Sequence, residues 1–314
     1  MAASGRPLKL RETGLLPRVY KFFVTIGEWL IKPILNLNPP AVRMHVRDVP
    51  YVSPPGNPKQ RLDVVVPEGA GPFPVIVYVH GGGFISMDKS HYTRIAKSLA
   101  SAGFVVFNVN YRRAPRFRYP NNLTDVGSAV SWVLSNARAY SGDPDRLFLA
   151  GDSAGAHLVS TYSTALADDK LARDFGIANL KKPARVAGLL LFYGVFDCDS
   201  VLATGFPFVK MMLEALLSRD PVVFEARARN ASPLRHVTSA YPPCFITYAE
   251  KDKLAGESVA FALVLEAKGV QHEVLAFPPS ECRHIPHGFF SMFWRKSAKR
   301  ATVAAINFLR SHSA

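Results

Sequence analysis

The chain has 314 residues, and 48% of them are hydrophobic, so it can bury one large α/β core with a cap or two modest domains. It carries 38 Lys and Arg against 24 Asp and Glu, which gives a formal net charge of +14. Because these basic residues are scattered and no known nucleic-acid-binding module occurs, dispersed surface charge is expected rather than nucleic-acid binding.

The first 45 residues precede the regular alternation of strands and helices and are predicted to form an N-terminal cap segment. Val19–Leu37 is apolar with a helical pattern, but its uncharged part is shorter than the roughly 20 residues of a membrane-spanning helix. Four residues interrupt it: Lys21, Glu28, Lys32 and Pro33. Residues 1–60 hold nine Lys or Arg against three Asp or Glu, which is typical of a helix on an anionic membrane surface. We expect a cytoplasmic protein, with peripheral membrane contact through this segment as an open alternative.

The first buried strand is predicted at Phe73–Val79, a run of β-branched and aromatic residues. His80 and three glycines follow directly. Since glycine has no Cβ, its N–H group can approach a substrate oxygen closely, so we predict the N–H groups of Gly81 and Gly82, with that of Ala154, as oxyanion donors. A Walker phosphate loop would need a Gly-Lys-Ser/Thr ending, which is absent from the sequence here. His80 is expected to brace the loop.

The next elements continue the alternation. Phe104–Val109 is predicted as a strand, and apolar residues between Asn121 and Tyr140 recur at helical spacing. Leu147–Ala150 is a short buried strand that leads into a second glycine motif.

That motif is Gly151-Asp-Ser153-Ala-Gly155, which fits the Gly-x-Ser-x-Gly pattern of a nucleophile on a sharp strand-to-helix turn. The two glycines remove side chains that would clash where strand and helix pass closely. The helix that follows points its positive end toward Ser153. An ordinary glycine turn is the alternative, but the preceding glycine loop supplies a second part of the same chemistry, which favours a nucleophilic serine.

Leu189–Tyr193 is the next strand, and an apolar region follows it at about residues 200–240. This region is rich in Phe, Met and Leu, which suit a cap over an apolar pocket. The competing interpretation is that these side chains pack against the core.

A further strand, Cys244–Ala249, precedes the candidate acids. In hydrolases with the Gly-x-Ser-x-Gly motif, the catalytic acid follows the serine in the sequence and precedes the histidine. The acid holds the imidazole of that histidine in one tautomer. Asp252 is the best candidate. The alternatives are Glu250, Asp197 and Asp199.

The last elements are a helix at Ser258–Lys268 and a strand at Glu273–Phe277. His287 follows that strand and precedes a long helix, where a loop at the carboxyl edge of a sheet would present a base. His284 lies on the same loop and is its main rival.

This alternation predicts a mostly parallel sheet with helices on both faces, formed by residues 46–314 with a cap insertion at about 200–240. Ligands bind such a sheet outside the carboxyl ends of its strands. The odd count of three cysteines, Cys198, Cys244 and Cys282, and the lack of a secretory signal favour reduced thiols, and their spacing does not indicate a zinc site.

Together the motifs resemble those of the hormone-sensitive-lipase family of α/β-hydrolases, over roughly residues 60–312. Five motifs carry the similarity: His80-Gly-Gly-Gly-Phe84, Tyr111-Arg-Arg-Ala-Pro115, Gly151-Asp-Ser-Ala-Gly155, Asp252 before Leu254, and His287-Gly-Phe289. The resemblance implies a triad of Ser153, Asp252 and His287, no metal and no cofactor. It also implies a small-molecule ester as substrate, usually with a short- to medium-chain acyl group, and a two-part cap.

Two positions depart from the family pattern. Arg116 stands where the family usually has Glu, and residues 278–286 form a longer segment before His287 than expected. We therefore expect a serine carboxylesterase whose substrate preference is open. The alternatives are an amide or lipid-ester hydrolase and a non-catalytic small-molecule receptor of the gibberellin-receptor kind, which resembles this family but lacks the histidine. Oligomeric state is not predicted.

Overall fold

The structure, a computed structural model, describes residues 26–281 and 285–313. Eight strands form one sheet: β1 (Met44–Pro50), β2 (Arg61–Val66), β3 (Phe73–Val79), β4 (Val105–Val109), β5 (Gly142–Asp152), β6 (Gly188–Phe192), β7 (Cys244–Ala249) and β8 (His272–Phe277). Their spatial order is β1-β2-β4-β3-β5-β6-β7-β8. Strand β2 runs antiparallel to its neighbours β1 and β4, whereas every other pair is parallel.

The central strands read as continuous apolar runs because helices cover both faces of the sheet. Every residue of β4, β6 and β7 is buried. The edge strands β1 and β8 are partly exposed. The predicted fold class, a mostly parallel sheet between helices, is therefore confirmed.

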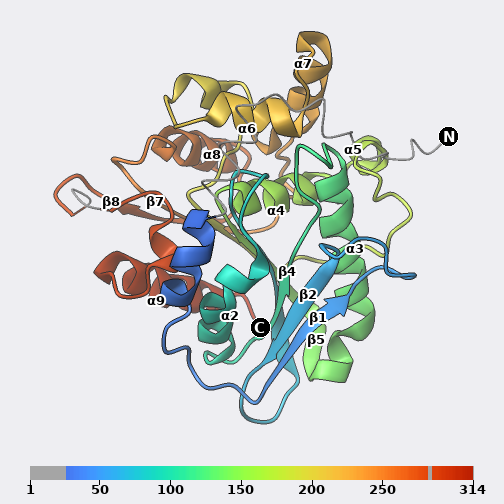
Figure 1. Ribbon diagram of the computed structural model, residues 1–314, viewed down its shortest axis with the longest axis vertical. Helices are drawn as coiled ribbons and strands as arrows, with labels where there is room; N and C mark the ends of the chain where they lie inside the picture. Colours follow the sequence, from blue (N-terminus) through green and yellow to red (C-terminus); the bar gives the residue numbers. More distant parts are fainter. Residues whose placement is uncertain (1–25, 282–284, 314) are drawn as a thin grey trace.

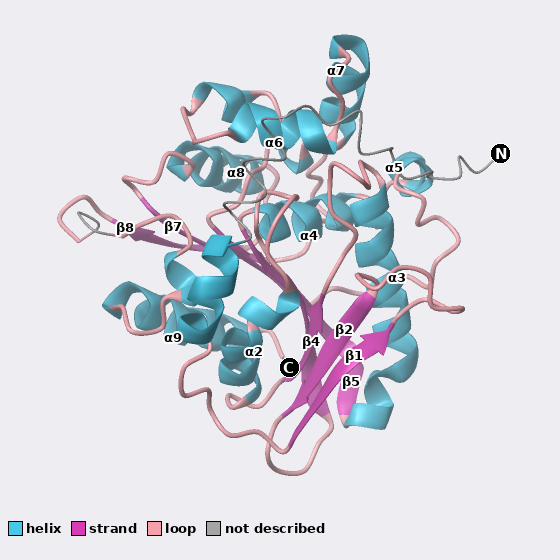
Figure 2. Cartoon of the chain, in the orientation of Figure 1, coloured by secondary structure: helices cyan, strands magenta, loops and turns pink. Residues whose placement is uncertain are grey.

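The α-helices of the described chain follow the strands in order. Those whose bounds are complete are α2 (Thr93–Ala100), α3 (Asn121–Asn136), α4 (Ala154–Thr164), α5 (Asp169–Asp174), α6 (Val209–Leu216), α7 (Pro221–Asn230), α8 (Ala255–Ala267) and α9 (Lys296–Ser311). Helices α2 and α9 lie on one side of the sheet, and α3 lies on the other (Figures 1 and 2). Residues 26–35 are also helical.

Helices α6 and α7 lie within the predicted cap insertion and stand beyond the end of the sheet at which the central strands finish (Figure 1). Buried side chains on α6, among them Leu213 and Leu216, face the body of the molecule. Across the described ranges, no helix combines the length and the apolar character needed to cross a membrane.

Several of the predicted strands differ from the observed ones at their ends, and β1 was not predicted. Strand β5 begins at Gly142 rather than at the predicted Leu147. Its first residues include Asp143, Pro144 and Asp145, which are unfavourable in strands, and its pairing with β3 shifts register after Pro74. Cys198 and Cys244 are free and buried, while Cys282 lies outside the described residues.

Candidate active site

The candidate nucleophile lies between β5 and α4. Ser153 has φ 50° and ψ −116°, a conformation that costs energy for a residue with a side chain. Its N–H group donates to the Phe192 carbonyl at 2.8 Å, which ties the turn to β6. The flanking glycines make the turn possible, because a Cβ on Gly155 would lie 2.0 Å from the Val79 carbonyl oxygen. The strand–turn–helix context predicted from the motif is therefore present.

The structure brings Ser153, His287 and Asp252 into one hydrogen-bonded chain. His287 Nε2 lies 2.9 Å from Ser153 Oγ, and His287 Nδ1 lies 2.7 Å from Asp252 Oδ2. Since a carboxylate only accepts hydrogen bonds, Nδ1 carries the proton and Nε2 presents its lone pair to the serine hydroxyl. The Asp252 side chain is 2% exposed and also accepts the Leu254 N–H through Oδ1 at 3.0 Å.

The rival acids and the rival base do not join this chain. Asp197 pairs with Arg235 at 2.9 Å, and Asp199 contacts the same guanidinium. Glu250 is exposed to solvent at the end of β7. His284 lies outside the described residues.

The contacts of the glycine loop differ from the predicted role of Gly81. The Gly81 N–H donates to Asp152 Oδ1 at 2.9 Å, so it does not serve as an oxyanion donor. Gly82 and Gly83 line the cavity beside Ser153, with φ of +110° and +58°. Within the described residues their N–H groups have no hydrogen-bond partner. Of the predicted pair, Gly81 is therefore engaged by Asp152 while Gly82 lines the cavity, and Gly83, which was not predicted, lines it as well.

The N–H of Ala154 is the third candidate donor. Ala154 is the first residue of α4, and the first N–H groups of a helix have no acceptor within that helix. Ala154 also lines the cavity, as predicted for a donor beside the nucleophile.

Asp152 holds the glycine loop against the elbow. Its carboxylate accepts hydrogen bonds from Gly81 N–H, from Tyr92 Oη at 3.0 Å and from Tyr78 Oη at 3.2 Å. The register of β3 and β5 makes these contacts possible, because Val79 pairs with Gly151. Burial raises the pKa of Asp152 to about 6, although the hydrogen bonds from Tyr92 and Gly81 act in the opposite direction.

This pKa predicts a stability effect. An unfolded Asp ionises near pH 3.8, so folding favours protonated Asp152, and its contribution to stability is lost as pH rises from about 4 to about 6. The difference corresponds to about 3 kcal/mol of unfolding free energy. We expect Asp152→Asn to abolish this part of the pH dependence in urea unfolding at pH 4 and pH 7. An unchanged difference between the two pH values would contradict the expectation, and Asp145→Asn, at an exposed site, serves as control.

His80 supports the loop from behind. Its ring stacks on Tyr111 at 4.5 Å between centroids, and Nδ1 lies 2.7 Å from the Gly81 carbonyl oxygen. Burial lowers the pKa of His80 to about 3, so the ring is neutral at physiological pH. These contacts are the bracing that the sequence predicts for His80.

Residues 111–115 form a second support for the glycine loop. Tyr111 Oη donates to the His80 carbonyl at 3.2 Å, and the Ala114 N–H donates to the Phe84 carbonyl at 3.0 Å. The predicted motif around these residues therefore contacts the glycine loop at both ends.

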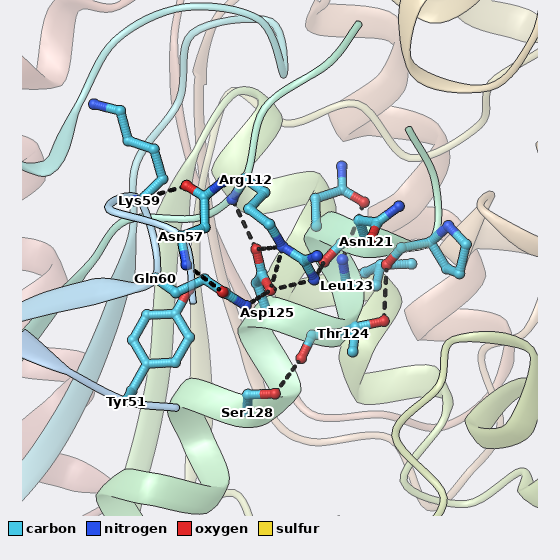
Figure 3. A network of polar contacts seen from close by, with 12 residues as sticks. Tyr51, Asn57, Lys59, Gln60, Arg112, Asn121, Leu123, Thr124, Asp125 and Ser128 are labelled. Atoms are coloured by element: carbon cyan, nitrogen blue, oxygen red, sulfur yellow. Dashed lines mark hydrogen bonds and ion pairs between the residues drawn. The ribbon is translucent and has the colours of Figure 1, made fainter. Parts of the chain in front are cut away.

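A buried ion pair fixes that support (Figure 3). Arg112 donates to both oxygens of the Asp125 carboxylate, with Nη2 to Oδ1 at 2.7 Å and Nε to Oδ2 at 2.9 Å. Gln60 Nε2 donates to the same carboxylate at 2.8 Å. Such a bidentate pair orients both partners, and Asp125 is completely buried on α3. The segment that contacts the glycine loop is thereby anchored to the helix beside it.

A cavity of about 410 Å³ opens beside Ser153 and His287. Its walls are mostly apolar, and the region of the predicted cap insertion contributes Phe206, Phe208, Met212 and Leu213. The Phe206 ring lies edge-on to the His287 ring, with 4.8 Å between the ring centroids, so this region contacts the candidate base directly. Arg116 is exposed, lies 5.5 Å from the Phe117 ring, and is outside the set of residues that line this cavity.

Comparisons with known proteins identify the family of this chain and several relatives. The BD-FAE family model matches residues 62–264. The chain is 27% identical to the probable carboxylic ester hydrolase LipM of Mycobacterium tuberculosis, over 76% of this chain and 54% of LipM. It is 31% identical to the carboxylesterase NlhH of the same organism, over 64% of this chain and 63% of NlhH. The chain spans about half to two thirds of the length of these relatives.

Solved structures share the architecture. Esterase B from Lactobacillus rhamnosis superposes with a TM-score of 0.84 at 20% identity, covering 97% of both chains. EstE1, a thermophilic carboxylesterase from a metagenomic library, superposes with a TM-score of 0.75 at 25% identity, covering 95% of this chain and 98% of EstE1. The fold is therefore that of the α/β-hydrolases.

Proposed function

The chain belongs to the BD-FAE family, and we propose that it is a serine carboxylesterase that hydrolyses short- to medium-chain acyl esters through an acyl-enzyme. The observation that carries this proposal is the hydrogen-bonded chain from Ser153 Oγ through His287 to Asp252. A receptor of the same fold has no need for a base oriented on a strained serine.

In the proposed mechanism, Ser153 Oγ attacks the ester carbonyl while His287 Nε2 takes its proton. The Asp252 carboxylate stabilises the imidazolium that forms and keeps the ring in place. Negative charge on the carbonyl oxygen is stabilised by the N–H groups of Gly82, Gly83 and Ala154, each such donor contributing roughly 3 kcal/mol to the lowered barrier. His287 then protonates the departing alcohol. Water, deprotonated by the same histidine, releases the acid and restores Ser153.

The proposal is tested with p-nitrophenyl esters from acetate to palmitate. We expect turnover with an optimum among the shorter chains, because the cavity has a volume of only about 410 Å³ and side chains of residues 206–213 form one of its walls. Failure of the folded protein to hydrolyse any ester in the series would remove the carboxylesterase proposal and favour a receptor or an amide substrate.

Met212 is proposed to limit the acyl chain. It lines the cavity, and its sulfur lies so near Gly83 that a Cβ on that glycine would be 2.5 Å from it. We expect Met212→Ala to raise kcat/KM for the decanoate ester relative to the butyrate ester by about tenfold, since pocket methylenes discriminate by roughly that factor. Met211→Ala is the matched control, because Met211 packs against the core outside the cavity lining. An unchanged ratio in the Met212 variant would place the limit elsewhere.

We also propose that the N-terminal segment makes peripheral contact with a membrane. The proposal draws support from its charge, nine Lys or Arg against three Asp or Glu in residues 1–60.

A further inference from the structure

The helix of residues 26–35 exposes its apolar side. Of the large hydrophobic residues in and just after it, Ile26, Trp29, Leu30, Ile34 and Leu37 are between 43% and 75% exposed. The spacing of these residues follows the helical repeat, so they form one continuous face. A surface helix of a globular protein ordinarily shows the opposite pattern, and an exposed apolar face of this kind marks an interaction site.

The opposite side of this helix holds it in a fixed position on the protein. Leu35 is 3% exposed, and Asn36 Nδ2 donates to the Ser90 carbonyl at 2.8 Å. The Glu28 carboxylate accepts the Met87 N–H at 2.6 Å. Because Leu35 and the carboxylate of Glu28 face the protein, rotation of the helix would expose Leu35 and break the bond to Met87.

The charges beside the face distinguish between possible occupants. Lys32, Arg47 and Lys97 line a hollow with Trp29 and Leu30, and in the part of the chain that the structure describes these three cations have no ion-pair partner.

The acidic side chains of the same hollow are already engaged. Asp63 and Asp48 share the buried Lys89, and Asp88 pairs with Lys59 at 2.6 Å, so these five groups leave one negative charge against the three unpaired cations. The net charge of the groups beside the apolar face is therefore positive.

The sequence before the helix adds to this charge. Residues 1–25 carry five Lys or Arg and one Glu, and they end where the apolar face begins. Two copies of a chain with a net charge of +14 would repel one another at such a face, whereas an anionic bilayer would attract it. An apolar helix face flanked by cations is the combination that binds in the headgroup region of anionic membranes.

We propose that the face formed by Ile26, Trp29, Leu30, Ile34 and Leu37 docks on an anionic phospholipid bilayer, with Lys32, Arg47 and Lys97 at the headgroups. Glu28 connects this face to the active site, because its partner Met87 lines the cavity beside Ser153. Docking would bring the cavity wall at Met87 within one helix of the lipid surface, and esters that partition into a bilayer would become the favoured substrates. That last step rests on the proposed esterase function, whereas the docking itself does not.

The experiment uses the full chain carrying Ser153→Ala, so that lipid hydrolysis cannot obscure binding. Sedimentation with phosphatidylcholine vesicles is compared with vesicles that also contain phosphatidylglycerol, at low salt. We expect binding to the anionic vesicles only, with a blue shift in fluorescence that Trp29→Phe removes. Leu30→Asp should weaken binding by about tenfold or more.

Leu263→Asp is the matched control, because Leu263 on α8 is 59% exposed and Leu30 is 58% exposed. It should bind as the parent does. The proposal is overturned if the protein stays in the supernatant with both vesicles, or if Leu30→Asp binds as well as Leu263→Asp. A dimer that Leu30→Asp dissociates, without vesicle binding, would assign the face to a second copy instead. Since none of these readouts needs catalysis, their failure is separable from failure of the esterase assay.

Discussion

Replacement of Ser153 by alanine is expected to lower kcat for p-nitrophenyl butyrate by about 10⁵- to 10⁶-fold, the loss that removal of a triad serine causes in other hydrolases. In the described chain Ser153 Oγ is the hydrogen-bond partner of His287 Nε2, at 2.9 Å, so no other hydroxyl is placed to replace it as nucleophile. KM should change little, since the apolar walls that bind the acyl group stay in place. Initial rates with the purified variant, after a matched fold check by circular dichroism, measure the effect.

Ser135→Ala is the control for this experiment. Ser135 is an exposed serine on α3, remote from the cavity lining, and its loss should leave kcat within about twofold. Retention of more than about one percent of activity by the Ser153 variant would contradict the assignment. Activity of that size cannot come from the oxyanion donors and binding alone.

Replacement of Asp252 by asparagine is expected to lower kcat by about 10⁴-fold. The Asp252 carboxylate accepts a hydrogen bond from the protonated Nδ1 of His287 at 2.7 Å. The amide of an asparagine could donate a hydrogen bond to that nitrogen instead. The proton would then reside on Nε2, which could no longer accept the proton of Ser153. The rate should recover partly at high pH if hydroxide takes over as base, and a pH–rate profile measures this.

Glu250→Gln serves as the matched control, since Glu250 lies two residues away, is exposed, and was a sequence-level alternative. We expect its kcat within about twofold of the parent. A larger loss in this variant than in Asp252→Asn would reverse the assignment of the acid.

The buried strands were the most predictable part of this fold. Phe73–Val79 and Cys244–Ala249 have the predicted bounds, because strands covered on both faces are continuous apolar runs. Strand β1 was not predicted. It lies at the sheet edge, mixes exposed and half-buried residues, and contains Asp48 at φ 59°, so its sequence has neither strict alternation nor an apolar run.

The site was predictable to the extent that backbone geometry follows from residue type. Glycines and the serine motif mark a sharp turn, and His287 and Asp252 follow strands whose carboxyl ends meet at one edge. The direction of an individual N–H group does not follow from the glycine run. It depends on the buried carboxylate of Asp152, which takes the Gly81 N–H and leaves Gly82 and Gly83 facing the cavity. The roles assigned to these residues and the division into a cap segment and a main domain stay predictions.

The order of Ser153, Asp252 and His287 along the sequence has a consequence for synthesis of the chain. Ser153, the glycine loop and Asp252 emerge from the ribosome before His287, and α9, whose Phe308 packs against Gly188 of β6, emerges after it. A nascent or truncated chain that ends before residue 287 has a nucleophile and no base. Under the proposed mechanism, ester turnover during translation would therefore begin only after the loop that carries His287 has docked beside Ser153 and Asp252.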